Sequence, residues 1–192
     1  MDILELIKTR RSVWEFEKRP IPREAIETIV QAGIWAPSSM NGQPWRFVVV
    51  GEPADLKSIA HEAKIELSNY LKTPEAEAKY GKENCERFMP RAEGEDELFY
   101  GAPAIVFVIS TNLESNHFDH GLAAENMMLC AHGLGVGSCP IGLAEPLNHS
   151  KKVQKLFGLK STEKIVIALV FGYPMEKPSA TKRNFDVVRW VE

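Results

Sequence analysis

Three short, strongly apolar runs most constrain the fold of this chain. Residues 46–50, 104–110 and 164–173 are rich in β-branched and aromatic side chains, which is typical of buried strands. A shorter strand is predicted at 136–139. Helical patterns fill most of the sequence between these runs. The sequence therefore predicts an α+β fold, in which helices flank a small mixed or antiparallel sheet.

The helices are predicted from apolar positions spaced three and four residues apart. The first begins after Asp2, which can cap it. The second has Pro22 in its first turn and ends before Pro37, because the residue before a proline disfavours the helical conformation. Three more are predicted after Pro53 and at about 118–132 and 145–157. The helix at 118–132 is apolar nearly all round, which is typical of deep burial or of a helix shared with a second subunit.

The organisation expected is one domain over residues 1–192, with two appendages. A chain of this length fits one domain, and it contains no repeat and no linker. The segment at about 73–98 has many charges and few aliphatic residues, so we expect a peripheral flap or helical excursion. The segment at about 174–192 ends in an amphipathic run and resembles an exchanged strand or arm.

Composition narrows the classes of function. The net charge is −3 and the pI about 6.0, so no general basic field attracts nucleic acid or an anionic membrane. No apolar run is long enough to span a bilayer, and the first residues do not resemble a signal peptide. The three cysteines lack paired spacing and are expected to be free thiols. These features favour a cytoplasmic protein.

Familiar catalytic and metal motifs are missing from the sequence. It contains no nucleophile elbow, no zinc-protease motif and no phosphate loop of the Walker type. His117 and His120 have no further residue spaced to complete a metal site, so we interpret them as surface or helix-start residues. The glycines at 133, 135 and 137 follow a helix and precede a strand. That order is the reverse of a dinucleotide-binding turn and predicts a helix end.

Four other stretches can be interpreted structurally or functionally. Arg10, Arg11 and Ser12 end the first helix and suit either a phosphate site or a solvated basic end. Residues 36–45 are dense in hydroxyls, amides and turn formers, which suits a polar heterocycle or a structural turn. Residues 138–142 carry a proline and a glycine that let a flat ring approach the backbone. Lys182 and Arg183 add positive charge near the end.

Together these stretches resemble the nitroreductase family of FMN-dependent oxidoreductases. Arg10, Arg11 and Ser12, followed by Phe16, resemble the opening signature of the family. The loop motif, the segment beside the flavin ring and the late basic pair correspond in order and spacing. Their residues are Pro37, Ser38, Ser39, Asn41, Gln43, Pro44 and Trp45; Pro140, Ile141 and Gly142; and Lys182 and Arg183.

The resemblance implies an intertwined homodimer with two FMN sites at its interface. Arg10, Ser12 and the pair Lys182 and Arg183 are then expected to hold the FMN phosphate, with Arg11 there or at the ribityl chain. The other subunit is expected to supply Pro37, Ser38 and Ser39, and Asn41 is expected to line the same pocket. Pro140, Ile141 and Gly142 are expected to line one edge of the flavin ring, with the Gly142 amide a donor to flavin N5.

The activity implied is ping-pong electron transfer. NADH or NADPH reduces the flavin, and a nitroaromatic, quinone or similar acceptor is reduced in turn, with no protein acid or base and no metal required. Position 14 is Trp14 here, whereas the family often has Arg or Lys there, and such a cation stabilises negative charge on the reduced flavin. The difference predicts a lower reduction potential of the flavin unless another basic side chain takes that role. As an alternative, Trp14 packs beside the first helix.

Other functions remain open at the level of sequence. Proteins with this fold also catalyse dehalogenation, flavin fragmentation and dehydrogenation of peptide-derived rings, and fold alone does not choose among them. A flavin-binding electron relay or sensor without turnover is a second possibility. A structural dimer with a degenerate site is a third.

Overall fold

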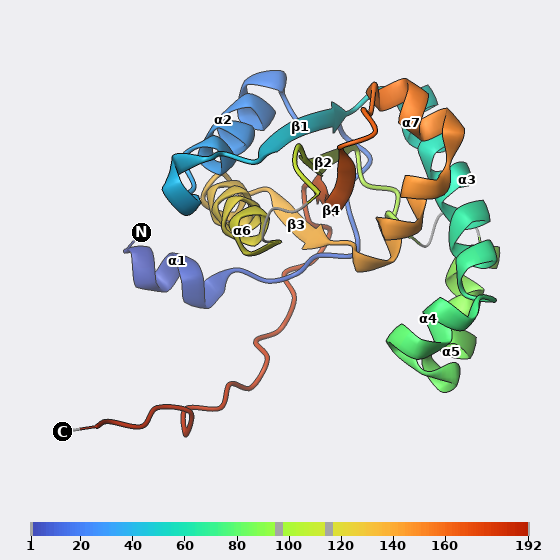
Figure 1. Cartoon of the computed structure of the whole chain (residues 1–192). Coiled ribbons are helices and arrows are strands. Elements are labelled where there is room, and N and C mark those ends of the chain that lie inside the picture. Colours follow the sequence, from blue (N-terminus) through green and yellow to red (C-terminus); the bar gives the residue numbers. More distant parts are fainter. Residues whose placement is uncertain (1, 95–97, 114–116, 192) are drawn as a thin grey trace.

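The structure is a computed structural model, and it describes residues 2–94, 98–113 and 117–191. At its centre is a four-stranded sheet in the order β1-β2-β4-β3 (Figure 1). The strands are β1 (Trp45–Val50), β2 (Ala104–Ser110), β3 (Gly137–Pro140) and β4 (Lys164–Gly172). All three pairings between neighbouring strands are antiparallel. The predicted α+β class and small sheet are confirmed, with antiparallel pairing throughout.

Two layers of helices sandwich this sheet, because β2 is apolar on both faces. Ile105, Phe107 and Ile109 face a core formed with α3 (Pro53–Tyr70) and α7 (Lys151–Phe157). The alternate residues Val106 and Val108 face a second core, formed with α2 (Arg23–Ile34) and α6 (His117–Gly133). Alternation along a strand places successive side chains on opposite faces, so one strand serves both cores.

The long apolar helix α6 lies between α2 and the sheet, which explains its composition. Met127 and Ala131 are fully buried. At Gly33 on α2, an added Cβ would lie 2.9 Å from Met127 Cγ, so the two helices approach closely there. The chain turns after α6 at Gly135, whose φ of +74° favours glycine. The predicted helix and the predicted turn after it are both confirmed.

The N-terminal helix α1 (Ile3–Thr9) packs only lightly on the body. It contains no buried residue, and Ile3, Leu4 and Ile7 are exposed. Asp2 occupies the N-cap position, but among the described residues its side chain makes no capping hydrogen bond, so the predicted cap is wrong. The exposed apolar residues indicate a surface suited to further contact.

The helix predicted at 145–157 is also wrong as a single element. The structure has a 3-10 helix η2 (Gly142–His149), a break at Ser150, and then α7. Pro146 lies inside η2 and has no N–H to donate. The Asn148 side chain pairs with the backbone of Ile165 on β4, accepting at 2.8 Å and donating at 2.8 Å. This tertiary contact favours the tighter geometry.

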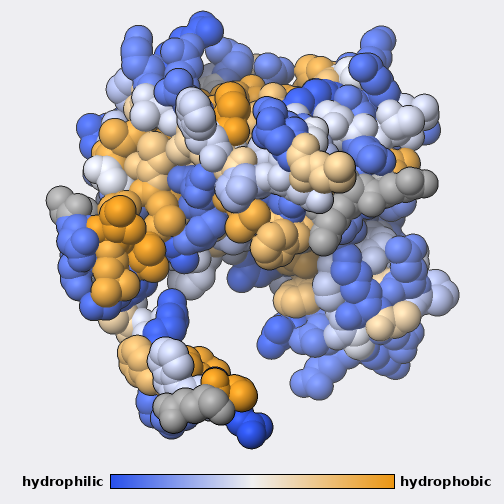
Figure 2. Space-filling view, turned by 60° about the vertical axis from the view of Figure 1, so that its left-hand side comes forward, coloured by the Kyte–Doolittle hydropathy of each residue, from blue (hydrophilic) through white to orange (hydrophobic). Residues whose placement is uncertain are grey.

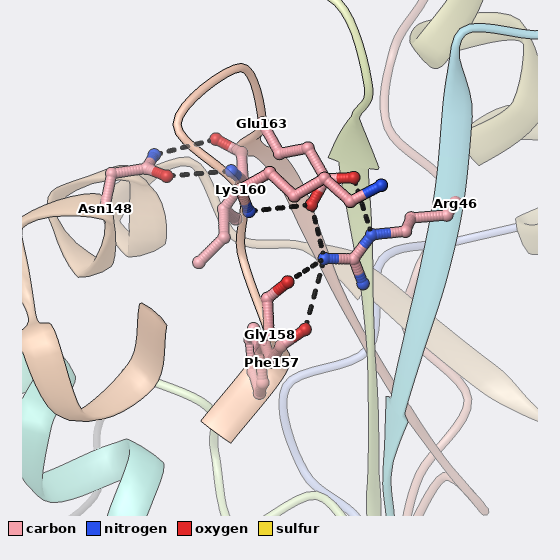
Figure 3. Close-up of polar contacts among 7 residues, drawn as sticks. Arg46, Asn148, Phe157, Gly158, Lys160 and Glu163 are labelled. Atoms are coloured by element: carbon pink, nitrogen blue, oxygen red, sulfur yellow. Dashed lines mark hydrogen bonds and ion pairs between the residues drawn. The ribbon is translucent and has the colours of Figure 1, made fainter. Parts of the chain in front are cut away.

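An ion pair joins the first strand to the loop before β4 (Figure 3). Arg46 on β1 donates from Nη2 and Nε to the Glu163 carboxylate, at 2.7 and 3.2 Å. Nη2 also donates to the Phe157 carbonyl at 3.1 Å, at the end of α7. The Lys160 amide donates to the same carboxylate at 3.1 Å. One guanidinium therefore holds the end of α7 and the start of β4 against β1.

The charged excursion is helical and packed. It comprises α4 (Pro74–Tyr80) and α5 (Lys82–Glu93), while 95–97 lie outside the described residues. Tyr80 makes edge contacts with the rings of Tyr70 and Phe88. Arg91 Nη1 donates to the Tyr100 hydroxyl at 2.7 Å. The described part of the predicted excursion is therefore helical.

The C-terminal arm, residues 174–191, contains no helix and no strand in its described length and projects from the body (Figure 1). Its apolar side chains are largely exposed, and Figure 2 shows them together with an apolar patch on the α1 side of the body. They are Phe185, Val187, Val188, Trp190 and Val191. None of the described helices is long and apolar enough to cross a membrane.

Candidate functional site

The chain after α1 runs along the edge of the sheet beside β3 and β4. The Val13 amide donates to the Ser138 carbonyl at 3.1 Å, and Ser12 forms a parallel bridge with Ser138. Two glycines allow this close approach. An added Cβ would lie 2.7 Å from Val13 at Gly137 and 2.6 Å from Phe16 at Gly172. The first predicted stretch is thereby brought to β3, which leads directly into the third.

A basic pocket opens where this segment leaves α1. Four residues with basic side chains line it, namely Arg10, Arg11, His132 and Lys177, together with the backbone of 135–138. Its volume is about 210 Å³. Within the described chain one carboxylate, that of Glu125, pairs with these groups, at 3.6 Å from Arg10 Nε. We refer to these four residues and their cavity as the basic pocket.

Two guanidinium nitrogens in the basic pocket lack partners. Arg11 Nη1 donates to the carbonyls of Lys8 and Arg10, at 2.6 and 2.7 Å. Arg10 Nη1 and Arg11 Nε are buried and have no hydrogen-bond partner among the described residues. Buried donors are nearly always paired in folded proteins, so these two indicate a site for an anion with several acceptor oxygens.

Residues 37–45 form a strained loop held by α6. The Ser39 amide donates to Asp119 Oδ2 at 3.2 Å, and His120 Nε2 lies 2.9 Å from the Pro44 carbonyl oxygen. Both side chains come from the first turn of α6 and are buried.

The backbone of this loop is unusual. Met40, Asn41 and Gln43 have positive φ, although none is glycine. The Gln43 amide donates to Ser38 Oγ at 2.9 Å, and Asn41 is exposed. The Asp119 and His120 contacts therefore keep a polar loop in a conformation that its residues rarely adopt alone.

The third stretch leaves β3 with its glycine open to solvent. Ile141 is buried and its amide donates to the Ala168 carbonyl at 2.8 Å, whereas Pro140 and Gly142 are exposed. An added Cβ at Gly142 would meet no atom within 4 Å. The main chain just beyond β3 is therefore unobstructed at Gly142, four residues after Ser138, which lines the basic pocket.

The structure does not bring all predicted residues together in one chain. The 37–45 loop contacts the first turn of α6, whereas His132 of the basic pocket lies in the last turn. The thirteen helical steps from Asp119 to His132 correspond to roughly 20 Å of helix. Lys182 and Arg183 are exposed in the projecting arm, where Arg183 donates to Thr181 Oγ1.

Sequence reasoning missed two residues of the basic pocket. His132 and Lys177 line it with the two arginines. Burial, together with the charges of Arg10, Lys177 and Arg11, lowers the pKa of His132. Lys177 also borders a second cavity with Trp14, whose side chain is 54% exposed. Trp14 thus lies beside the arm, and a cation stands next to the position where the family often has one.

Comparison with known proteins decides the family. The sequence model of the nitroreductase family matches residues 7–173. This chain belongs to the nitroreductase family. It is therefore an oxidoreductase, and the expected resemblance is confirmed.

Named relatives of this nitroreductase cover nearly the whole chain. A Methanothermobacter thermautotrophicus protein, provisionally named NADH dehydrogenase/NAD(P)H nitroreductase, is 29% identical, covering 97% of this chain and 84% of its own. Iodotyrosine deiodinase 1 of Rattus norvegicus is 25% identical over 97% of this chain and 68% of its own. A nitroreductase from Bacteroides fragilis, solved with bound FMN, is 24% identical and covers 100% of both chains with a TM-score of 0.84.

The chain carries three cysteines in addition to the titratable groups of the basic pocket. Cys85, Cys130 and Cys139 are free thiols, as predicted. Burial raises the pKa of the Cys139 thiol, so it is a poor nucleophile. Within the described residues, no group of three or more His, Cys, Asp or Glu side chains is arranged to hold a metal ion.

Proposed function

We propose that this nitroreductase is a cytoplasmic, FMN-dependent enzyme that passes electrons from NADH or NADPH to a nitroaromatic, quinone or similar acceptor. The observation that carries the proposal is the basic pocket. It holds two buried guanidinium nitrogens that have no partner among the described residues, and it is lined by Ser138 on β3, the strand that leads to the open backbone at Gly142. A phosphate and a planar ring on one ligand match those two features.

The residues present fit FMN. Arg10 and Arg11 bind the phosphate from the basic pocket, and Ser12 adds a hydroxyl beside them. Lys182 and Arg183 are carried on an arm that begins next to this pocket at Pro174 and Lys177, and they add charge once the arm is ordered. Pro140, Ile141 and Gly142 line the ring edge, with the Gly142 amide as a donor.

When bound, FMN would supply the redox chemistry, namely hydride transfer from the nicotinamide donor and electron transfer to the acceptor in ping-pong order. The protein residues bind and orient. Cationic side chains fix one end of the cofactor, and backbone donors fix the other. No side chain of the chain has to act as an acid or base.

The homodimer is part of the proposal, because a single chain separates its own site residues. The 37–45 loop lies at the far end of α6 from the basic pocket, so Pro37, Ser38, Ser39 and Asn41 reach the cofactor of a second subunit. The arm offers exposed apolar side chains, and β1 is an edge strand of the sheet. Exchange of arms covers these surfaces.

The visible spectrum of the purified protein tests this function. We expect a yellow protein whose absorbance near the flavin band bleaches with NADH or NADPH without oxygen and returns when a quinone or nitroaromatic is added. The preferred donor is the one that bleaches faster. A colourless protein that takes up no added FMN contradicts the proposal and favours a degenerate structural dimer.

Two alternatives are separated by the same sample. A yellow protein inert to both nicotinamides is the flavin-binding relay or sensor. The similarity to iodotyrosine deiodinase 1 favours a dehalogenase as the second candidate. A reduced protein that releases iodide from an iodophenol, and reoxidises faster with it than with nitroaromatics or quinones, identifies that activity.

A further inference from the structure

His132 lines the basic pocket, and its imidazole is a group that can take up a proton. Its ring belongs to the last turn of α6 and is part-buried, with Nε2 at 2.9 Å from Thr9 Oγ1. Arg10, Arg11 and Lys177 line the same cavity. The FMN phosphate contacts proposed for Arg10, Arg11 and Ser12 do not involve this imidazole.

The hydrogen bonds of Thr9 fix which ring nitrogen carries the proton. Its hydroxyl lies 2.6 Å from the Glu5 carbonyl oxygen, and a carbonyl can only accept, so the single hydroxyl proton is donated there. The hydroxyl oxygen must then accept from His132 Nε2–H. In the neutral ring, Nδ1 is left as an acceptor, and no described residue donates to it.

The charges around His132 disfavour a second proton as long as the pocket lacks an anion. Arg10 and Arg11 face it from the end of α1, and Lys177 faces it from the arm. The carboxylate of Glu125, on α6, pairs with Arg10. Burial and these cations lower the pKa of His132, so the ring is neutral near pH 7. A phosphate dianion reverses the sign of this local field.

We propose that His132 takes up a proton from solvent when the FMN phosphate binds, and that its Nδ1–H then donates to a phosphate oxygen. This inference rests on the proposed function. A neutral imidazole offers Nδ1 only as an acceptor, which repels phosphate oxygens, whereas the imidazolium offers a donor and a charge. FMN affinity is therefore expected to fall as the pH rises, and riboflavin, which has no phosphate, gains nothing from His132.

Calorimetry of FMN binding to the flavin-free full chain tests this directly. At pH 7.5 the FMN phosphate is already mainly a dianion, since its second pKa is about 6. Titrations in two buffers of different ionisation enthalpy give the number of protons taken up. We expect about 0.5 to 1 proton per FMN in the natural protein, and none with riboflavin.

Two variants make the test specific. His132→Gln keeps a donor for Thr9 but cannot titrate, and we expect it to bind FMN without proton uptake. His61→Gln removes an exposed histidine on α3 and is expected to behave as the natural protein. Unchanged proton uptake in His132→Gln, or none in the natural protein, overturns the proposal.

A flavin-independent measurement separates this inference from the proposed function. Sulfate does not titrate near pH 7, so it can be compared with chloride at equal ionic strength while NMR follows each histidine ring. We expect sulfate to raise the pKa of His132 and to leave that of His61 unchanged. No effect of sulfate on His132 contradicts the inference even in a yellow enzyme. If sulfate raises the pKa of His132 in a protein that does not bind FMN, the anion site is supported and the proposed flavin function is contradicted.

Discussion

At the scale of single residues, the pair of Arg46 and Glu163 shows how burial affects the contribution of an ion pair to folding stability. The Glu163 side chain is only 4% exposed and accepts from the guanidinium and from the Lys160 amide. Arg46 is about a third exposed, so solvent screens part of the attraction. Loss of the arginine leaves a buried carboxylate with one remaining donor.

Replacing Arg46 by Met is therefore expected to lower the free energy of unfolding by about 2 kcal/mol, because the buried Glu163 carboxylate loses its charged partner. Urea unfolding of the natural protein and the variant measures this. The matched control is Arg23→Met, which breaks a pair with Glu27 at the same 2.7 Å distance but fully on the surface. It should change stability by less than about 0.5 kcal/mol. Equal effects would show that burial is not the deciding factor.

The same pair predicts a pH dependence. Hydrogen bonding to Arg46 lowers the pKa of Glu163 below that of an unfolded glutamate, about 4.3. The pair thus stabilises the fold fully above that value, and the contribution is lost as the pH falls through the lowered pKa of the folded state. The stability difference between the natural protein and Arg46→Met should accordingly shrink on acidification below about pH 4.

The sequence could predict that neighbouring residues of similar chemistry lie close together in the structure. Arg10, Arg11 and Ser12 stand together in sequence, and the structure places the two arginines on one pocket. His132 and Lys177 could not be found in this way. His132 ends an ordinary apolar helix, and Lys177 lies in an irregular arm. Their proximity to Arg10 depends on how α1 packs at the end of α6.

At the scale of elements, the segment at 12–17 depends on two glycines of the sheet. At Gly172, an added Cβ would lie 2.6 Å from Phe16 and 2.8 Å from Pro103. Gly172→Ala is therefore expected to lower stability by about 1 to 3 kcal/mol, as overpacking does, and to weaken FMN binding by moving Ser12. Thermal unfolding and flavin titration measure the two effects.

The control for this prediction is Gly51→Ala, near the same proline. Its Cβ would lie 3.9 Å from the Pro103 carbonyl, an ordinary contact. We expect its unfolding temperature and flavin affinity to match those of the natural protein. Should Gly172→Ala also match, the close approach of Phe16 does not constrain the segment.

Most elements were predictable because local pattern and tertiary environment agree. Residues 104–110 are apolar at every position except the last, Ser110, and the structure buries all of them between two helical layers. The prediction of a single helix at 145–157 failed because the geometry of this segment depends on a partner that is remote in the sequence. Asn148 pairs with the backbone of Ile165 on β4, and the spacing of apolar residues along the sequence cannot reveal that contact. The strained loop at Met40 and Asn41 likewise depends on Asp119 and His120 from α6.

At the scale of the whole molecule, the proposed dimer accounts for surfaces that a monomer leaves exposed. The apolar residues of α1 and of the arm are open to solvent, and together they exceed the scattered exposure usual for monomers (Figure 2). The proposed flavin site also requires a loop from the far end of a second α6. Assembly and cofactor binding are therefore expected to depend on each other.

A chain ending at Asn184 tests this dependence, because it removes the exposed apolar end of the arm but keeps Lys177, Lys182 and Arg183. Burial of one large apolar side chain contributes about 2 kcal/mol, and each dimer loses two copies of several. We expect the dimer dissociation constant to rise on the order of a hundredfold or more. Light scattering after gel filtration measures the mass, and absorbance measures retained FMN.

Leu156→Ser is the control, since it removes a half-exposed apolar side chain on α7, away from the arm. It should remain dimeric and yellow. The shortened chain should become monomeric at micromolar concentration and lose FMN, although its phosphate-binding cations are intact. A shortened chain that is monomeric but still yellow would mean that one subunit holds the flavin alone, and the 37–45 loop would then lose its proposed role.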